Sequence, residues 1–334
     1  MVNRSYFLRM SSPYYVWAPR YNETSAGVVV LHLLCHSLNV SGQEAYLIIE
    51  SSLRVDECVK KGLLTPILTR KILLQHQREK RQPVIIYPEV VMGNPLGASK
   101  IVRYYLNKPG FFTGAKHLNL NEFNLAYTSS MLNGYQEADH ILYLPLINTN
   151  LFCVPERPEK RVSGKVCYYL GRNRDAKRTS VLIKPDSVEI TLKYPANKIE
   201  LVKIFQECEY FISYQDSGLC LEATLCGCIA IILPNKDTES PLSEKETMMY
   251  GIAWGDSPGE IARAQATLGL VRNLYINRID EFWVSLDLFI EKSQEIHCGE
   301  DVIIDVSSYF GINRFFYRVK KKLLKLSKKA ICSS

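Results

Sequence analysis

The sequence predicts an α/β protein built from two domains of similar size. The chain has 334 residues, 47% of them apolar, and at about 150 residues per domain this length suggests two cores. Short apolar runs alternate with helical patterns, which is typical of parallel sheets covered by helices. A charged segment with two prolines, residues 155–161, is the best linker candidate. The expected domains are residues 1–155 and 162–305, followed by a tail at 306–334.

Each half is expected to contain several buried strands, because apolar runs of this length bounded by turn residues fit the inside of a parallel sheet. In the first half the strands are predicted at Ala45–Ile49, Pro83–Tyr87 and His140–Leu144, and the helices at Gly27–Leu38 and Ser99–Leu106. In the second half the strands are predicted at Val166–Leu170, Val188–Leu192, Tyr210–Tyr214 and Ile229–Leu233, and the helices at Lys198–Cys208, Leu219–Cys226 and Pro258–Leu274.

The charge of the chain is concentrated at one end. The net charge is +7, but residues 306–334 hold eight basic and no acidic residues, which leaves 33 basic and 34 acidic residues elsewhere. A nucleic-acid-binding protein usually spreads positive charge over a face, so nucleic acid is not an expected partner. No run of about 18 uncharged apolar residues and no secretory signal is found. Ten cysteines without a CxxC pair favour buried, reduced thiols over a zinc site.

The tail has the pattern of a basic amphipathic helix. Apolar residues recur at spacings of three and four, at Ile312, Phe316, Val319, Leu323, Leu326 and Ala330, and lysines and arginines flank them. This pattern predicts that residues 312–334 bind an anionic membrane surface. The alternative is a helix packed on the protein with a solvated polar face.

Phosphate-binding signals in this chain do not follow the common motifs. Neither GxGxxG nor GxxxxGK[ST] occurs, and no Asp-x-Asp pair is present to hold a divalent cation. A pyrophosphate would therefore have to be neutralised by basic side chains and helix N-termini, and no metal is expected. After the predicted strand at 166–170, Gly171 is followed by Arg172, Arg174, Lys177 and Arg178, where open α/β sheets bind ligands. The alternative for this cluster is a solvated basic loop.

A second candidate anion site follows the predicted strand at 210–214. Asp216 and Ser217 are both plausible N-caps of the next helix, and Ser217 and Gly218 would expose amides at its positive end. Glu222, one to two turns into this helix, could accept hydrogen bonds from ribose hydroxyls or simply be a solvated side chain.

These passages together resemble a GT-B glycosyltransferase of the bacterial type that builds lipopolysaccharide, O-antigen or capsule. Residues 22–27 with 28–38 and 42–46 look like the first loop and helix of such enzymes, where acceptor and donor phosphate meet. Gly171-Arg172 with Lys177 is similar to the basic pair that grips the diphosphate. Residues 216–223 with Cys226-Gly227-Cys228 are similar to the carboxylate-containing donor loop. Residues 87–89 and 93–97 also resemble passages of surface-glycan transferases, and the resemblance extends over about residues 13–280.

The resemblance implies two Rossmann-like domains facing a central cleft, with a nucleotide-sugar donor in the second and a lipid-linked glycan acceptor in the first. It implies donor-binding roles for Gly171, Arg172, Lys177, Asp216, Ser217, Gly218 and Glu222, and acceptor or first-loop roles for Ser25, Ala26, Gly27, His32 and Asn94. No cofactor is implied, and the location is the cytoplasmic face of a bacterial inner membrane, held peripherally. C-terminal helices in such folds often cross back onto the first domain. The alternatives are a nucleotide-sugar 2-epimerase and a non-catalytic glycan-assembly subunit.

The chemistry of transfer needs a group to deprotonate the acceptor hydroxyl if the enzyme inverts. Glu89, which follows the predicted strand at 83–87, is the first candidate, and Glu23 is the second. The retaining branch has two glutamates eight positions apart in the donor loop. The later one matches Glu222, but Tyr214 occupies the earlier position, so inversion and retention both stay open. His32 either contributes to the acceptor pocket or is a buried, hydrogen-bonded histidine.

Overall fold

The computed structural model describes residues 11–49, 57–114, 121–155, 161–171, 180–236 and 238–296. These residues form two compact units. The first contains the described residues up to Leu125 and those from Asp287 onward, and the second runs Ala126–Leu286. This division differs from the predicted boundary at residues 155–162. The predicted tail at 306–334 lies outside the described residues.

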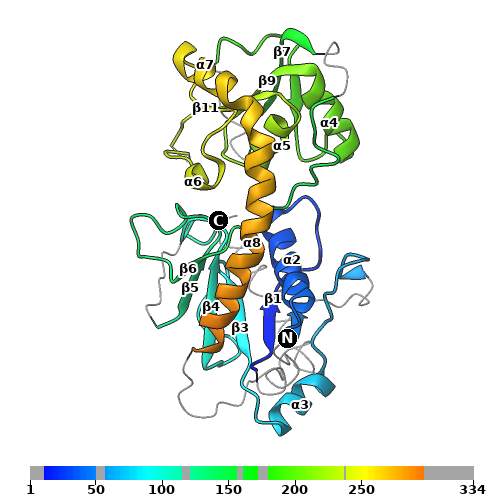
Figure 1. Ribbon diagram of the computed structural model, residues 1–334, viewed down its shortest axis with the longest axis vertical. Coiled ribbons are helices and arrows are strands. Elements are labelled where there is room, and N and C mark those ends of the chain that lie inside the picture. The colour runs from blue at the N-terminus through cyan, green and yellow to red at the C-terminus, as the bar shows by residue number, and fades with distance from the viewer. Residues whose placement is uncertain are drawn as a thin grey trace, which may run out of the picture. The chain divides into compact units, whose positions relative to one another are not determined.

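The first sheet is six-stranded within the described residues and has the order β2-β1-β3-β4-β5-β6 (Figure 1). Neighbours are parallel in the pairs β1–β2, β1–β3 and β3–β4. The elements are β1 (Tyr14–Trp17), α2 (Ala26–Val40), β2 (Ala45–Ile48), α3 (Arg70–Arg78), β3 (Val84–Pro88), β4 (Lys100–Tyr105), β5 (Phe123–Ala126) and β6 (His140–Ile141). Helix α2 buries Val30, Leu31, Leu34 and Leu38 and packs on β1 and β2. The side chain of Asn39 bonds both backbone groups of Ala45 and so fixes the turn into β2.

The predicted helix at Ser99–Leu106 is wrong, because these residues form strand β4. The apolar residues at 101, 102, 104 and 105 resemble the buried face of a helix if Lys100 and Arg103 are taken to lie on its solvent-exposed face. Instead both are buried, with 9% and 5% of their surface exposed. Lys100 donates to Ser12 Oγ and to the carbonyl of Gln294, and Arg103 pairs with Glu122. These two charged side chains are buried with specific partners, so the strand lacks the alternation of polar and apolar residues that identifies one in sequence.

The second sheet is parallel and, in the part of the chain that is described, has five strands in the order β11-β10-β9-β7-β8. The elements are β7 (Val162–Tyr169), β8 (Val188–Ile190), α4 (Lys198–Glu207), β9 (Cys208–Ser213), α5 (Gly218–Leu225), β10 (Ile229–Ile232), α6 (Glu244–Thr247), β11 (Ile252–Trp254), α7 (Pro258–Thr267), η3 (Leu268–Leu270) and α8 (Val271–Gln294). The core contains Cys167, Cys208, Cys220, Cys226 and Cys228, all as buried free thiols. The prediction of two parallel α/β units is confirmed.

The last turns of α8 belong to the first unit. The Tyr14 hydroxyl lies 2.8 Å from Ser293 Oγ, and Gln294 exchanges two side-chain hydrogen bonds with the backbone of Ser12. The ring of Phe289 is fully buried and lies 6.2 Å from the ring of Tyr14. The chain therefore returns to the first unit after completing the second, as the resemblance implied.

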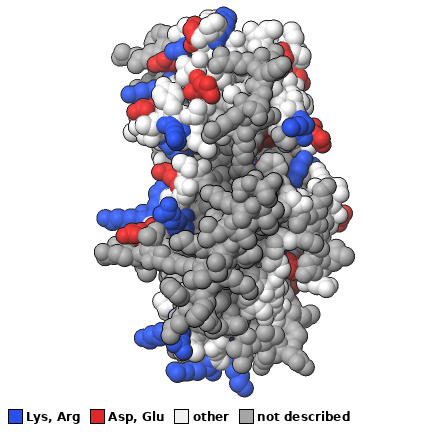
Figure 2. Space-filling view, turned by 180° about the vertical axis from the view of Figure 1, so that it is seen from behind, with Lys and Arg blue, Asp and Glu red and all other residues white. Residues whose placement is uncertain are grey.

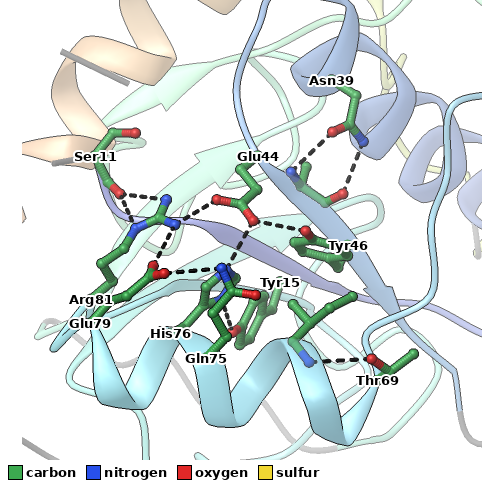
Figure 3. A network of polar contacts seen from close by, with 12 residues as sticks. Ser11, Tyr15, Asn39, Glu44, Tyr46, Thr69, Gln75, His76, Glu79 and Arg81 are labelled. Carbon is green, nitrogen blue, oxygen red and sulfur yellow. Dashed lines mark hydrogen bonds and ion pairs between the residues drawn. The ribbon is translucent and has the colours of Figure 1, made fainter. Parts of the chain in front are cut away.

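A buried polar network lies at the amino end of the first sheet (Figure 3). The Tyr15 hydroxyl lies 2.6 Å from His76 Nδ1, and His76 Nε2 lies 2.9 Å from Glu44 Oε1. Arg81 pairs with the other Glu44 oxygen at 2.7 Å, and the Tyr46 hydroxyl donates to Glu44 Oε1. Tyr15 has no exposed surface, whereas the Glu44 side chain is 35% exposed. The network links β1, β2, α3 and the segment before β3.

Among the described residues that Figure 2 shows, charged side chains of both signs are present, in small groups separated by uncharged residues. This agrees with the near balance of acidic and basic residues outside the tail. Among the described residues, no helix is both long and apolar enough to cross a membrane.

Candidate functional site

The carboxyl ends of β1, β3 and β4 and the beginning of α2 come together at one edge of the first sheet. The amide of Leu106, which follows β4, donates to Glu89 Oε2 at 3.1 Å. A Cβ added to Gly27, in the first turn of α2, would lie 3.6 Å from Leu106 Cδ1. The structure therefore places the predicted base Glu89 and the predicted first-loop residue Gly27 both next to Leu106.

Glu89 is a partly buried carboxyl group that follows the last residue of β3. Burial raises its pKa to about 7, against the smaller opposing effects of backbone amides and of the Arg103 charge. A carboxyl group with this pKa is part ionised near neutral pH and can accept a proton from a hydroxyl group there. Its geometry and protonation thus suit a general base.

The other residues predicted for the first loop differ in their surroundings. Ser25 is the N-cap of α2 but makes no side-chain capping bond, and Ala26 is exposed. Glu23 is exposed and lies 3.7 Å from Lys60 Nζ, so its carboxylate is screened by water. His32 is fully buried, its Nε2 lies 2.9 Å from the carbonyl of Pro19, and burial lowers its pKa. This is the arrangement of a buried, hydrogen-bonded histidine.

Asn94 organises the loop between β3 and β4. Its Oδ1 accepts from the amide of Ala98 at 2.9 Å and from the Tyr87 hydroxyl at 3.2 Å, and its Nδ2 donates to the Ala98 carbonyl. Because both the oxygen and the nitrogen of its side-chain amide bond to neighbouring residues, Asn94 stabilises the conformation of the loop between β3 and β4.

In the second unit, Gly171 lies two residues after β7 and close to Gln215, which lies two residues after β9. Gly171 has a φ of +68°, and a Cβ there would lie 2.7 Å from Gln215 Oε1. A side chain at 171 would therefore meet both backbone strain and the Gln215 side chain. Glycine at this point lets the backbone at residue 171 lie close to the Gln215 side chain.

The loop after β9 leads into the N-terminus of α5. Asp216 Oδ2 accepts from the amide of Leu242 at 2.7 Å, so this carboxylate holds the segment before α6. Ser217 is the N-cap of α5 with extended backbone, but its side chain makes no capping bond, and its buried Oγ has no partner in the structure as described. Gly218, the first residue of α5, is exposed. The first amides of a helix have no acceptor within it, so this end of α5 carries a partial positive charge.

Glu222 lies one turn into α5 and is buried, with 8% of its surface exposed. Its Oε1 accepts from Lys198 Nζ at 3.2 Å, and burial raises its pKa while Lys198 opposes that effect. The predicted ribose ligand therefore has one oxygen committed to a lysine at the start of α4.

The remaining donor-site predictions, Arg172 and Lys177, lie outside the described residues. Three residues near the carboxyl edge of the second sheet were not predicted as site residues: Gln215 after β9, Asn235 after β10 and Lys198 at the start of α4. Asn235 Nδ2 donates to the carbonyl of Tyr214 and so ties the loops after β9 and β10. The position of Gln215 directly after a strand was a usable signal, whereas Lys198 is distant in sequence from its partner. No group of acidic, histidine or cysteine side chains arranged to hold a metal ion is found among the described residues.

Comparison with known proteins gives likeness at the level of structure. No protein-family model matches the chain, and no curated protein sequence matches it. The solved structure of a glycosyltransferase from Rickettsia africae ESF-5 superposes with a TM-score of 0.52 at 11% identity, covering 86% of this chain and 98% of that one. The spinosyn rhamnosyltransferase SpnG with thymidine diphosphate gives 0.41 at 14% identity (84% and 99% covered), and SnogD from Streptomyces nogalater gives 0.40 at 12% (84% and 99%). The likeness to the Rickettsia structure shows that this chain has the predicted two-unit fold of the GT-B kind.

Proposed function

We propose that this protein transfers a sugar from a nucleotide-sugar donor to an acceptor hydroxyl, with Glu89 as the general base. The observation that carries the proposal is the partly buried Glu89 carboxyl group, with a pKa of about 7, beside the start of α2. The fold supports the proposal, because the chain superposes on the solved structure of a glycosyltransferase from Rickettsia africae.

The donor is assigned to the carboxyl edge of the second unit. The close approach of Gly171 to Gln215 and the unpartnered Ser217 hydroxyl at the start of α5 support this assignment. Backbone amides at a helix N-terminus favour phosphate, and the sequence adds Arg172 and Lys177 to match its charge.

The reaction is proposed to be an inverting displacement. The acceptor oxygen attacks the anomeric carbon, its proton passes to Glu89, and the bond from that carbon to the nucleoside diphosphate breaks. Negative charge on the leaving diphosphate is stabilised by the basic residues and amides of the donor site. Inversion is favoured because Tyr214, at the position of the first glutamate of retaining relatives, is a buried aromatic residue of the core.

The acceptor is proposed to be a lipid-linked glycan of a bacterial surface polymer, and the protein to lie peripherally at the cytoplasmic face of the inner membrane. The sequence of residues 312–334 supports this part, through its apolar stripe and unbalanced positive charge. Metal-independent transfer is proposed because the sequence offers no Asp-x-Asp pair.

The proposal is tested by comparing Glu89→Gln with Glu23→Gln. With membrane lipid extract as acceptor, Glu89→Gln is expected to lower kcat by about 10²- to 10⁴-fold, because it removes the base. Donor affinity measured by calorimetry should change less than twofold, and Glu23→Gln should retain near-normal turnover. Near-normal turnover of Glu89→Gln would contradict the assignment.

Two alternatives are distinguished by the same samples. An epimerase would convert the nucleotide sugar to its epimer in the absence of any acceptor, which NMR of the product detects. A non-catalytic assembly subunit would neither consume a nucleotide sugar nor be stabilised by one against heat.

A further inference from the structure

Arg103 and Glu122 form a buried ion pair close to Glu89. Arg103 lies on β4 in register with Tyr87 of β3, two residues before Glu89. Its Nε lies 2.8 Å from Glu122 Oε2, and its Nη2 lies 2.9 Å from Glu122 Oε1. Their side chains are 7% and 3% exposed. A buried pair of this kind is a weak source of stability, because both charges lose their hydration.

The guanidinium group also holds the backbone that follows Glu89. Nη1 donates to the carbonyl of Val91, and Nη2 donates to the carbonyl of Gly93 at 2.7 Å. The group lies 5.1 Å from the centre of the Tyr87 ring, and the Tyr87 hydroxyl in turn accepts from the amide of Leu96. The chain from Glu89 to Leu96 is therefore tied to β3 and β4 by one cation and one phenol.

The charge of Arg103 is matched by Glu122 rather than by Glu89. The hydrogen-bond partner of the Glu89 carboxylate is the uncharged amide of Leu106. Among the described residues, Arg103 on β4 is the cation whose charge lowers the pKa of Glu89. Tyr105, also on β4, is close enough to feel the charges of Arg103, Glu122 and Glu89. A direct Arg–Glu89 ion pair would make the carboxylate a poor base at neutral pH.

We propose that Arg103, with its charge matched by Glu122, is a positioning residue for Glu89. It fixes the segment that carries the carboxylate, while that carboxylate has no ion-pair partner among the described residues and can accept a proton. The inference rests on the proposed role of Glu89, but its physical content can be measured without turnover.

The test is a direct titration of Glu89 in the full chain. Protein labelled with ¹³C at glutamate side chains is titrated by NMR, and the Glu89 signal is assigned by its loss in Glu89→Gln. Glu122→Gln keeps the shape of the pair but leaves Arg103 uncompensated, so the Glu89 titration should move to lower pH by about one unit. Arg103→Gln should move it to higher pH. Glu44→Gln, the same change in the distant network of Figure 3, should leave it unchanged.

The variant Arg103→Lys separates the positioning of Glu89 by Arg103 from the effect of the Arg103 charge on the pKa of Glu89. Lysine keeps the cation but lacks the flat fork that reaches both Glu122 oxygens and two carbonyls. The titration of Glu89 should stay near its original pH, whereas release of nucleoside diphosphate from a UDP-hexose should fall at least tenfold at a pH where Glu89 is ionised. Binding of uridine diphosphate should be unchanged.

Two results would overturn the proposal: a Glu89 titration that does not respond to Glu122→Gln, or Arg103→Lys with full turnover. If Arg103→Gln fails to fold, Glu122→Gln and Arg103→Lys still decide the question. If the wild-type protein turns over no nucleotide sugar, the titration still tests the Arg103–Glu122 effect, and the failure belongs to the proposed function.

Discussion

The Tyr15–His76–Glu44 network predicts an unusually large cost for removing one hydroxyl group. His76 Nε2 faces the Glu44 carboxylate, so in the neutral ring Nδ1 accepts from the Tyr15 hydroxyl at 2.6 Å. Tyr15 is 0% and His76 1% exposed, so water cannot replace the lost donor in Tyr15→Phe. The loss of the bond and the stranded Nδ1 together should cost about 2–3 kcal/mol of unfolding free energy.

The neighbouring residue Tyr14 provides a matched control. Tyr14 is equally buried, and its hydroxyl lies 2.8 Å from Ser293 Oγ. In Tyr14→Phe, Ser293 still donates to the carbonyl of Ile290 at 3.2 Å, so no buried group is left without a partner. The expected cost is about 1 kcal/mol.

Urea unfolding followed by circular dichroism and by tryptophan fluorescence measures both costs, and Trp17 on β1 reports on the first unit. The slope of the transition should stay constant, because neither substitution alters the surface exposed on unfolding. Equal costs for the two variants, or a cost below about 0.5 kcal/mol for Tyr15→Phe, would show that the network does not act as described.

Four other outcomes are expected. Gly171→Ala should destabilise the second unit by about 1–2 kcal/mol because of its positive φ, and should weaken uridine diphosphate binding because the new methyl group clashes with Gln215. The control Gly255→Ala also has a positive φ but no atom within 4 Å of the added Cβ, so it should lower stability without affecting binding. The pKa of Glu44 is lowered by its partners, so its stabilising effect is complete above the ordinary value of 4.5 and is lost as pH falls; Glu44→Gln should flatten the acid side of a stability profile. Transfer should persist in EDTA, and restoration by added magnesium or manganese after a loss would refute the metal-free mechanism. Reversing Lys321, Lys322 and Lys325 to Glu should release the protein from anionic vesicles in a flotation assay, and full retention would refute the tail's proposed role.

The alternation of elements and the loops at strand ends could be predicted from sequence because both depend on local pattern. The strands at 45–48 and 229–232 and the helix from 198 to 207 lie where apolar spacing placed them, within one residue at each end. Glu89 could be predicted as a site candidate since it follows a buried strand and precedes a Gly-Asn-Pro loop. Its protonation could not, because burial at 89 depends on how β4 and α2 pack around it.

Features that depend on partners distant in sequence were missed. Strand β4 was mistaken for a helix because nothing local shows that Arg103 faces Glu122 or that Lys100 faces Gln294. Similarly, Glu222 could be placed on its helix, but its pairing with Lys198 joins two helices separated by strand β9. In each case the missing information was the partner that makes burial of a charge tolerable.

The return of α8 to the first unit has a consequence for synthesis on the ribosome. The second unit is one continuous stretch, Ala126–Leu286, whereas the first needs residues on both sides of that stretch. Phe289, Ser293 and Gln294, which complete the packing around Tyr14 and Ser12, emerge only after the second unit has been translated. The first unit is therefore the last to acquire all its contacts. Until α8 has been synthesised, part of the apolar surface of β1 stays exposed to solvent.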